Sequence, residues 1–208
     1  SWAWDEDPEP PDVFYPPRAD IQTALTVLGR RSEARLTYEK GKDYRLDLRS
    51  TAIPNADLTH ARLGPAQFHG ANLQRAVLEG ANLQEAGLGG ANLLRAVLRG
   101  ANLQGARLRG ANFESADLVL CSMALNSLRS VVLRGARNLS ADSITSTFGV
   151  KRGVGQTVLP NGITPPDHWH DAGEGEKDTA EAQRAYQRAY EAWLKTQEVA
   201  SKEGGDPA

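Results

Sequence analysis

Residues 71–115 read ANLQR AVLEG ANLQE AGLGG ANLLR AVLRG ANLQG ARLRG ANFES, a run of five-residue blocks that differ little from one another. The pattern extends without an insertion over residues 46–135, which makes 18 blocks. The third position of every block is Leu, Ile, Phe or Met, and the first position is Ala in the blocks from Ala56 to Ala116. Because an internal repeat defines the architecture before local propensities do, this period decides the fold.

A period of five residues fits neither regular secondary structure. On an α-helix, five residues advance a side chain by roughly 140°, which spreads the leucines around every face. On a flat strand, an odd spacing sends successive leucines to opposite sides of the sheet. Only a chain that turns once per block, always in the same direction, keeps every third-position residue inside. The repeat therefore predicts a solenoid.

The blocks resemble those of the pentapeptide-repeat proteins, a bacterial family whose motif is Ala-(Asp/Asn)-Leu-x-x. Ala71-Asn72-Leu73, Ala91-Asn92-Leu93 and Ala116-Asp117-Leu118 match this motif as written. The resemblance implies an all-β fold: a right-handed quadrilateral β-helix with four blocks in each 20-residue coil. In such a coil the central Leu and the preceding Ala point inward. At about 4.8 Å per coil, the 18 blocks would form a rod roughly 22 Å long.

The composition of the 208 residues excludes several classes of protein. Lys and Arg number 24 against 26 Asp and Glu, so the net charge of -2 argues against a dedicated nucleic-acid binder. Aromatic residues are only 6%, so small aliphatic residues must fill the core. Cys121 is the single cysteine, which excludes an internal disulfide, and we expect it to be a small buried residue. No run of 18 apolar residues is present, so we expect no membrane span within this chain.

Shifts in composition divide the chain into five parts. Their bounds are 1–19, an acidic and Pro-rich linker; 20–45, an N-terminal capping helix and connector; 46–135, the repeats; 136–176, an irregular flap; and 177–208, an amphipathic helix and tail. Ile21, Leu25 and Leu28 have helical spacing, so we expect this helix to lie across the first coil. An uncapped solenoid end would expose its core and its unpaired strand edge.

The segment before the repeats also resembles the corresponding segment of membrane-anchored pentapeptide-repeat proteins. This resemblance implies a cytoplasmic location, with a tether to the inner membrane through an upstream segment that this chain does not contain. The chain begins with Ser1 and its only methionine is Met123, which predicts a processed or truncated product.

Three groups of residues are candidates for an interaction surface. Apolar side chains interrupt the outward positions of the last blocks, and the tail of the chain or a partner, including a second copy, would cover them. Arginines one coil apart form two like-charge stacks, which cost stability unless solvent screens them or an anion or acidic partner lies there. Aromatic residues form a stripe on the C-terminal helix, which packs on the rod, pairs with another helix or binds a partner. The groups are Val119, Leu120, Leu125, Val131 and Val132; Arg75 over Arg95 and Arg109 over Arg129; and Tyr186, Tyr190 and Trp193.

Motifs for catalysis are missing from the sequence. It holds no nucleophile elbow, phosphate-binding loop or pair of catalytic carboxylates. His168 and His170 alternate along an extended segment, but zinc needs three or four ligands. We therefore expect no enzyme activity, no cofactor and no metal.

The sequence is best interpreted as a noncatalytic protein-interaction scaffold, the soluble part of a membrane-associated protein. We expect an unidentified protein partner, and a homodimer through the C-terminal end stays open. Some pentapeptide-repeat proteins imitate duplex DNA and bind type II topoisomerases, which is the alternative function that the resemblance implies. The repeats carry nine Arg against six acidic residues, whereas mimicry needs dense negative charge.

Overall fold

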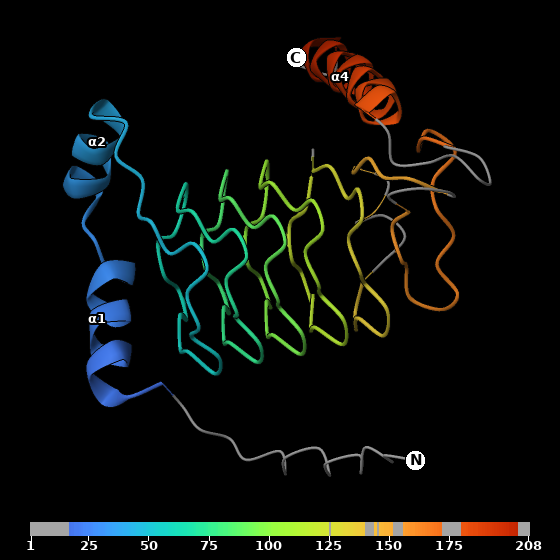
Figure 1. Cartoon of the computed structure of the whole chain (residues 1–208). Helices are drawn as coiled ribbons and strands as arrows, with labels where there is room; N and C mark the ends of the chain where they lie inside the picture. The colour runs from blue at the N-terminus through green and yellow to red at the C-terminus, as the bar shows by residue number, and fades with distance from the viewer. Residues whose placement is uncertain are drawn as a thin grey trace, which may run out of the picture.

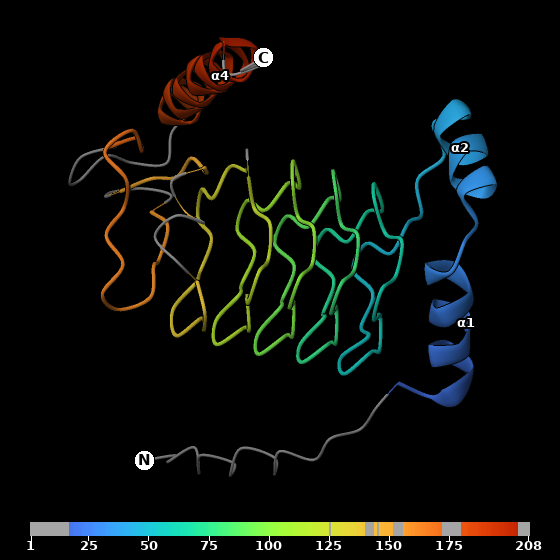
Figure 2. The same ribbon diagram turned by 180° about the vertical axis from the view of Figure 1, so that it is seen from behind.

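The computed structural model describes residues 17–124, 126–139, 144, 146–151, 156–171 and 180–203. A rod of stacked coils forms the centre of the molecule (Figure 1). Helices α1 (Ala19–Gly29) and α2 (Glu33–Gly41) lie at one end of this rod, and α4 (Ala180–Glu203) lies beside the other end, as the view from behind also shows (Figure 2). None of the helices within these residues is long and apolar enough to cross a bilayer.

Each coil of the rod has 20 residues and four sides. Parallel bridges join residues 20 positions apart, from Asp47 with Gln67 to Asp117 with Arg137. A side holds one bridging residue followed by a turn, so the described residues contain isolated bridges and no longer strand. The expected all-β character is therefore limited to these bridges, because a five-residue side leaves no room for a longer ladder. The right hand of the coil stays a prediction.

The turns explain the residue types at the fifth position. The carbonyl of Leu73 accepts a hydrogen bond from the Ala76 amide at 3.0 Å, and this contact recurs block after block. The fifth position lies in the left-handed region, with φ of 57° at Arg75 and 62° at Gly80. A turn closed in this way with positive φ only at its third residue is type II, which favours glycine there.

The core consists of the first and third positions of the blocks. Leu73, Leu83 and Leu93 are 0% exposed, as are the alanines at the first positions of their blocks. Cys121, which occupies a first position, is also buried, and its burial raises the pKa of its thiol to about 12. The expectation of a small buried cysteine is confirmed.

Helix α1 completes the hydrogen bonds of the first coil. The side-chain amide of Gln22 accepts from the Asp57 amide at 3.0 Å and donates to the Asp57 carbonyl at 2.7 Å. The Gly29 carbonyl accepts from the Arg62 amide at 2.8 Å. A Cβ on Gly29 would lie 2.8 Å from the Cβ of Ala61, so only glycine permits this approach. Together with buried Leu25, these bonds cap the open edge of the rod.

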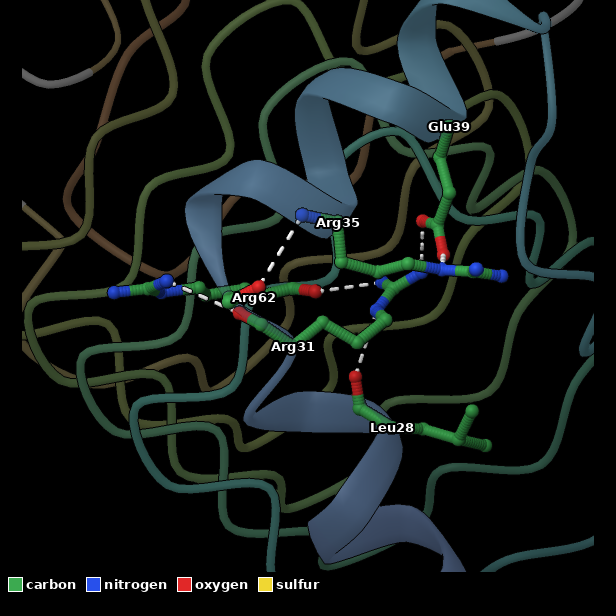
Figure 3. A network of polar contacts seen from close by, with 6 residues as sticks. Leu28, Arg31, Arg35, Glu39 and Arg62 are labelled. Atoms are coloured by element: carbon green, nitrogen blue, oxygen red, sulfur yellow. Dashed lines mark hydrogen bonds and ion pairs between the residues drawn. The ribbon is translucent and has the colours of Figure 1, made fainter.

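A buried carboxylate holds the cap together (Figure 3). Glu39, which is 5% exposed, accepts from Arg31 at 2.6 Å and from Arg35 at 2.7 Å. Arg31 also donates to the Leu28 carbonyl and, at 2.8 Å, to the carbonyl of Arg62. The Arg62 guanidinium donates in return to the Arg31 carbonyl. Arg31 therefore links α1, α2 and the first coil.

The C-terminal end continues the ladder with longer connections. Phe148 bridges to Ser127, and Val158 bridges to Val132, which is 26 residues earlier. Thr157, which is buried, donates its hydroxyl to the Leu128 carbonyl at 2.6 Å. The flap residues Ile144, Phe148 and Trp169 are buried, so this irregular segment covers the last coil.

Candidate interaction surfaces

The apolar residues of the last blocks do not form the single outward patch that the sequence suggested. Val131 is 0% exposed and lies in the core, because it occupies a first position of its block, where earlier blocks have Ala. The outward placement of Val131 was therefore wrong. Val132 is half-buried and is paired with Val158 of the flap, while Val119 is half-buried. Leu125 lies outside the described residues.

Leu120 is the member of this group that stays uncovered. It is 88% exposed, with a φ of 53° at the fifth position of its block, so the turn points its side chain away from the rod. Among the described residues of the repeats, no other large apolar side chain is comparably exposed. The tail thus covers part of the apolar group and leaves Leu120 exposed.

The two arginine stacks have different environments. Arg75 is half-buried, and Arg95 and Arg109 are exposed. Arg129, expected on the surface, is instead 4% exposed, because α4 covers it and its guanidinium lies 5.2 Å from the centre of the Tyr186 ring. At this distance the ring face attracts the cation. Arg129 is therefore a positioned side chain rather than a mobile surface charge.

The aromatic stripe of α4 packs against the flap of the same chain. Phe148 is at the centre of the cluster, with ring centres 5.5 Å from Tyr186, 5.7 Å from Tyr190 and 5.6 Å from Trp193. The Tyr186 hydroxyl lies 2.8 Å from the Ser127 hydroxyl and donates to the Phe148 carbonyl. Burial raises the pKa of the Tyr186 hydroxyl. The partial burial of Tyr190 raises its pKa as well. Of the three alternatives for this helix, the structure has the stripe packed on its own chain.

Replacing Trp193 with Ala tests this packing. Trp193 is 8% exposed, and its removal leaves a cavity beside Phe148, so we expect α4 to lose about 3 kcal/mol of its docking free energy. Amide hydrogen exchange should then accelerate along α4 but not at mid-rod residues. Lys195→Ala, an exposed change on the same helix, is the control. Equal protection of α4 in both variants would contradict the packing.

A cavity of about 630 Å³ lies between the rod and α4. Its lining includes Arg107, Arg109 and Arg129 of the rod, with Arg184 and Tyr190 of α4. The sequence pointed to Arg109 and Arg129, but it missed Arg107 and Arg184. The 20-residue register could have placed Arg107 beside Ser127, whereas no signal in the sequence places Arg184 over this side of the rod.

Ligands for a metal do not converge in the described part of the chain: no group of three or more His, Cys, Asp or Glu side chains has the required proximity there. His168 is used otherwise, since its ring stacks on Trp193 with centres 5.5 Å apart and its Nε2 lies 2.7 Å from the Thr147 carbonyl.

Comparison with known families identifies the repeats. A family model described as pentapeptide repeats matches in eight copies, over residues 45–80, 54–88, 76–114 and 106–137. The comparison with curated protein sequences gave no match.

Several solved structures are similar to this chain. A pentapeptide-repeat protein (Rfr23) from the cyanobacterium Cyanothece 51142 is 22% identical, with 67% of this chain and 100% of that chain covered and a TM-score of 0.45. HetL, involved in heterocyst differentiation regulation in the cyanobacterium Nostoc, is 25% identical, with 60% and 62% covered and a TM-score of 0.21. QnrB1, a plasmid-mediated fluoroquinolone resistance protein, is 19% identical, with 54% and 70% covered and a TM-score of 0.25. These values are too low to transfer a partner or a function.

Proposed function

Because this chain belongs to the pentapeptide-repeat proteins through residues 45–137, we propose that it is a noncatalytic scaffold that binds another protein. A stiff rod with both ends capped presents long, regular walls, which suit binding better than catalysis. The observation that carries this proposal is Leu120. It is an 88% exposed leucine on a rod whose third-position leucines from Leu58 to Leu133 are buried.

The alternative function, DNA mimicry toward a topoisomerase, has no such support. Two of the columns that stack from coil to coil contain Asn72, Asn92 and Asn112 on one side, and Asp57, Val77, Val97 and Asp117 on another. Each asparagine uses its side-chain oxygen within its own turn, as Asn92 does toward the Leu94 amide at 3.1 Å. The second column has two aspartates, and Asp117 is paired with Arg99 at 2.7 Å, so these columns lack the dense negative charge that a duplex presents.

We also propose that the chain is the soluble part of a bacterial, membrane-associated protein, with its tether upstream and the rod in the cytoplasm. The resemblance of the segment before the repeats supports this arrangement. A homodimer of this chain would need an interface other than the aromatic stripe of α4, because Tyr186 and Trp193 are already buried within one chain.

The test of the scaffold compares Leu120→Asp with Gly100→Asp. Gly100 is exposed at the same corner one coil earlier, has a φ of 63°, and a Cβ there would meet nothing within 4 Å. We expect Leu120→Asp to melt like the parent protein, and Gly100→Asp to stay folded with a loss of about 1 kcal/mol, because its φ of 63° favours glycine. In the native cell, cross-linking of the tagged parent and of Gly100→Asp should capture the same partner, and Leu120→Asp should lose it. No captured partner, or the same partner with Leu120→Asp, would contradict the proposal.

A further inference from the structure

The cavity between the rod and α4 is strongly positive. Four arginines line it, Arg107, Arg109, Arg129 and Arg184, and none of the described residues that line it is acidic. The whole chain, by contrast, has a net charge of -2. A concentration of one sign of charge in a hollow attracts counter-charged ligands from solution. The cavity therefore attracts anions.

The guanidinium groups of Arg107, Arg109 and Arg184 are available to a ligand. Among the described residues, no hydrogen bond or ion pair engages the guanidinium of Arg107, Arg109 or Arg184. Arg129 is held in place under Tyr186, so its side chain loses little further conformational entropy when a ligand binds. Guanidinium groups bind carboxylates through paired hydrogen bonds, which are stronger than those between neutral groups.

The spacing of the arginines suits an extended peptide better than a single small anion. Arg107 and Arg109 flank the inward Leu108 and are both exposed, and residues two apart on an extended chain are about 6.4–6.8 Å apart. Carboxylates at alternate positions of an extended peptide have this same spacing. Arg129 continues the row in the next coil, since its carbonyl accepts from the Gly110 amide at 3.1 Å. Arg184 faces the row from α4.

We propose that this cavity, the arginine groove, binds an extended acidic segment of a protein partner with carboxylates at alternate positions. This inference rests on the proposed scaffold function and assigns a second contact to it, separate from Leu120.

The experiment measures binding of the fluorescent peptide Glu-Gly-Glu-Gly-Glu to the full chain by anisotropy, at low and at physiological salt. We expect binding that weakens as salt rises, and no binding of the matched Gln-Gly-Gln-Gly-Gln peptide. Arg184→Glu should weaken binding at least about tenfold, which corresponds to the loss of one charge-assisted contact. Arg188→Glu makes the same charge change one turn along α4, at an exposed residue outside the cavity lining, and should change the affinity less than about twofold.

A second variant keeps the test decisive. Glu174 and Glu176 alternate in this chain shortly before Ala180, in a segment outside the described residues, so the chain itself carries the pattern of the test peptide. To remove competition from these carboxylates, the peptide is also tested against the double variant Glu174→Gln and Glu176→Gln. Failure of the peptide to bind either protein would overturn the proposal. Equal weakening of peptide binding by Arg184→Glu and Arg188→Glu would also overturn it. A third contrary result would be binding of inorganic phosphate that depends on Arg184 while the peptide does not bind. Because the purified chain alone is used, the outcome is independent of the cellular test of Leu120.

Discussion

Leu93→Asp is expected to unfold the rod. Leu93 is 0% exposed in a central coil, and the surrounding core positions carry Leu and Ala, which offer an ionised carboxylate no partner. Burial of an unpaired charge costs far more than burial of a neutral polar group. We therefore expect a loss of more than about 4 kcal/mol in the free energy of unfolding, measured by urea denaturation followed by circular dichroism.

Leu94→Asp provides a matched control for this change. Leu94 is the next residue and is half-buried at the fourth position, outside the core. The same substitution there should cost no more than about 1 kcal/mol, since its carboxylate reaches water. Equal costs at positions 93 and 94 would mean that the third position is not the inward one.

Glu39→Ala is expected to release the N-terminal cap. Without Glu39, the Arg31 guanidinium, whose side chain is only 11% exposed, keeps a buried charge with no carboxylate beside it. Removal of one member of a buried ion pair typically costs 3–5 kcal/mol, so we expect a loss of about 3 kcal/mol. Hydrogen exchange at the Asp57 and Arg62 amides should accelerate, because both depend on α1 for their bonds.

Arg35→Ala separates this effect from the loss of a surface contact. The Arg35 side chain is 56% exposed, so its ion pair with Glu39 is screened by solvent and should contribute less than about 1 kcal/mol. If Arg35→Ala and Glu39→Ala destabilise the protein equally, the buried link through Arg31 does not stabilise the cap.

The repeat region could be predicted from the sequence because one constraint recurs in every block. A large apolar residue at each third position and an Ala at most first positions have only one arrangement that buries them all, so the register follows from counting. The misplacement of Val131 came from judging it by its apolar character, although its first position in the block already indicated the core. Leu120 could be placed outward, because the fifth position is the corner of the turn.

The ends of the rod could be predicted less well. The side-chain amide of Gln22 bonds the backbone groups of Asp57 that a preceding coil would otherwise bond. Nothing in the local sequence of α1 indicates this role. The stripe of α4 was compatible with three kinds of partner, and only the position of Phe148 in the flap decides among them. Arg184 joins the arginine groove through this packing, so its role depends on tertiary contacts that no local pattern encodes.

The 20-residue register is tested most directly by cysteine cross-linking. Asn92 and Asn112 are bridged in neighbouring coils, where Cα atoms about 4.8 Å apart permit a disulfide, whereas Arg107 lies on a different side of the coil. Native Cys121 is buried and does not compete. We predict rapid oxidation of the pair Asn92→Cys with Asn112→Cys and little of the pair Asn92→Cys with Arg107→Cys. Faster cross-linking of the second pair, which is closer in sequence, would contradict the four-sided coil.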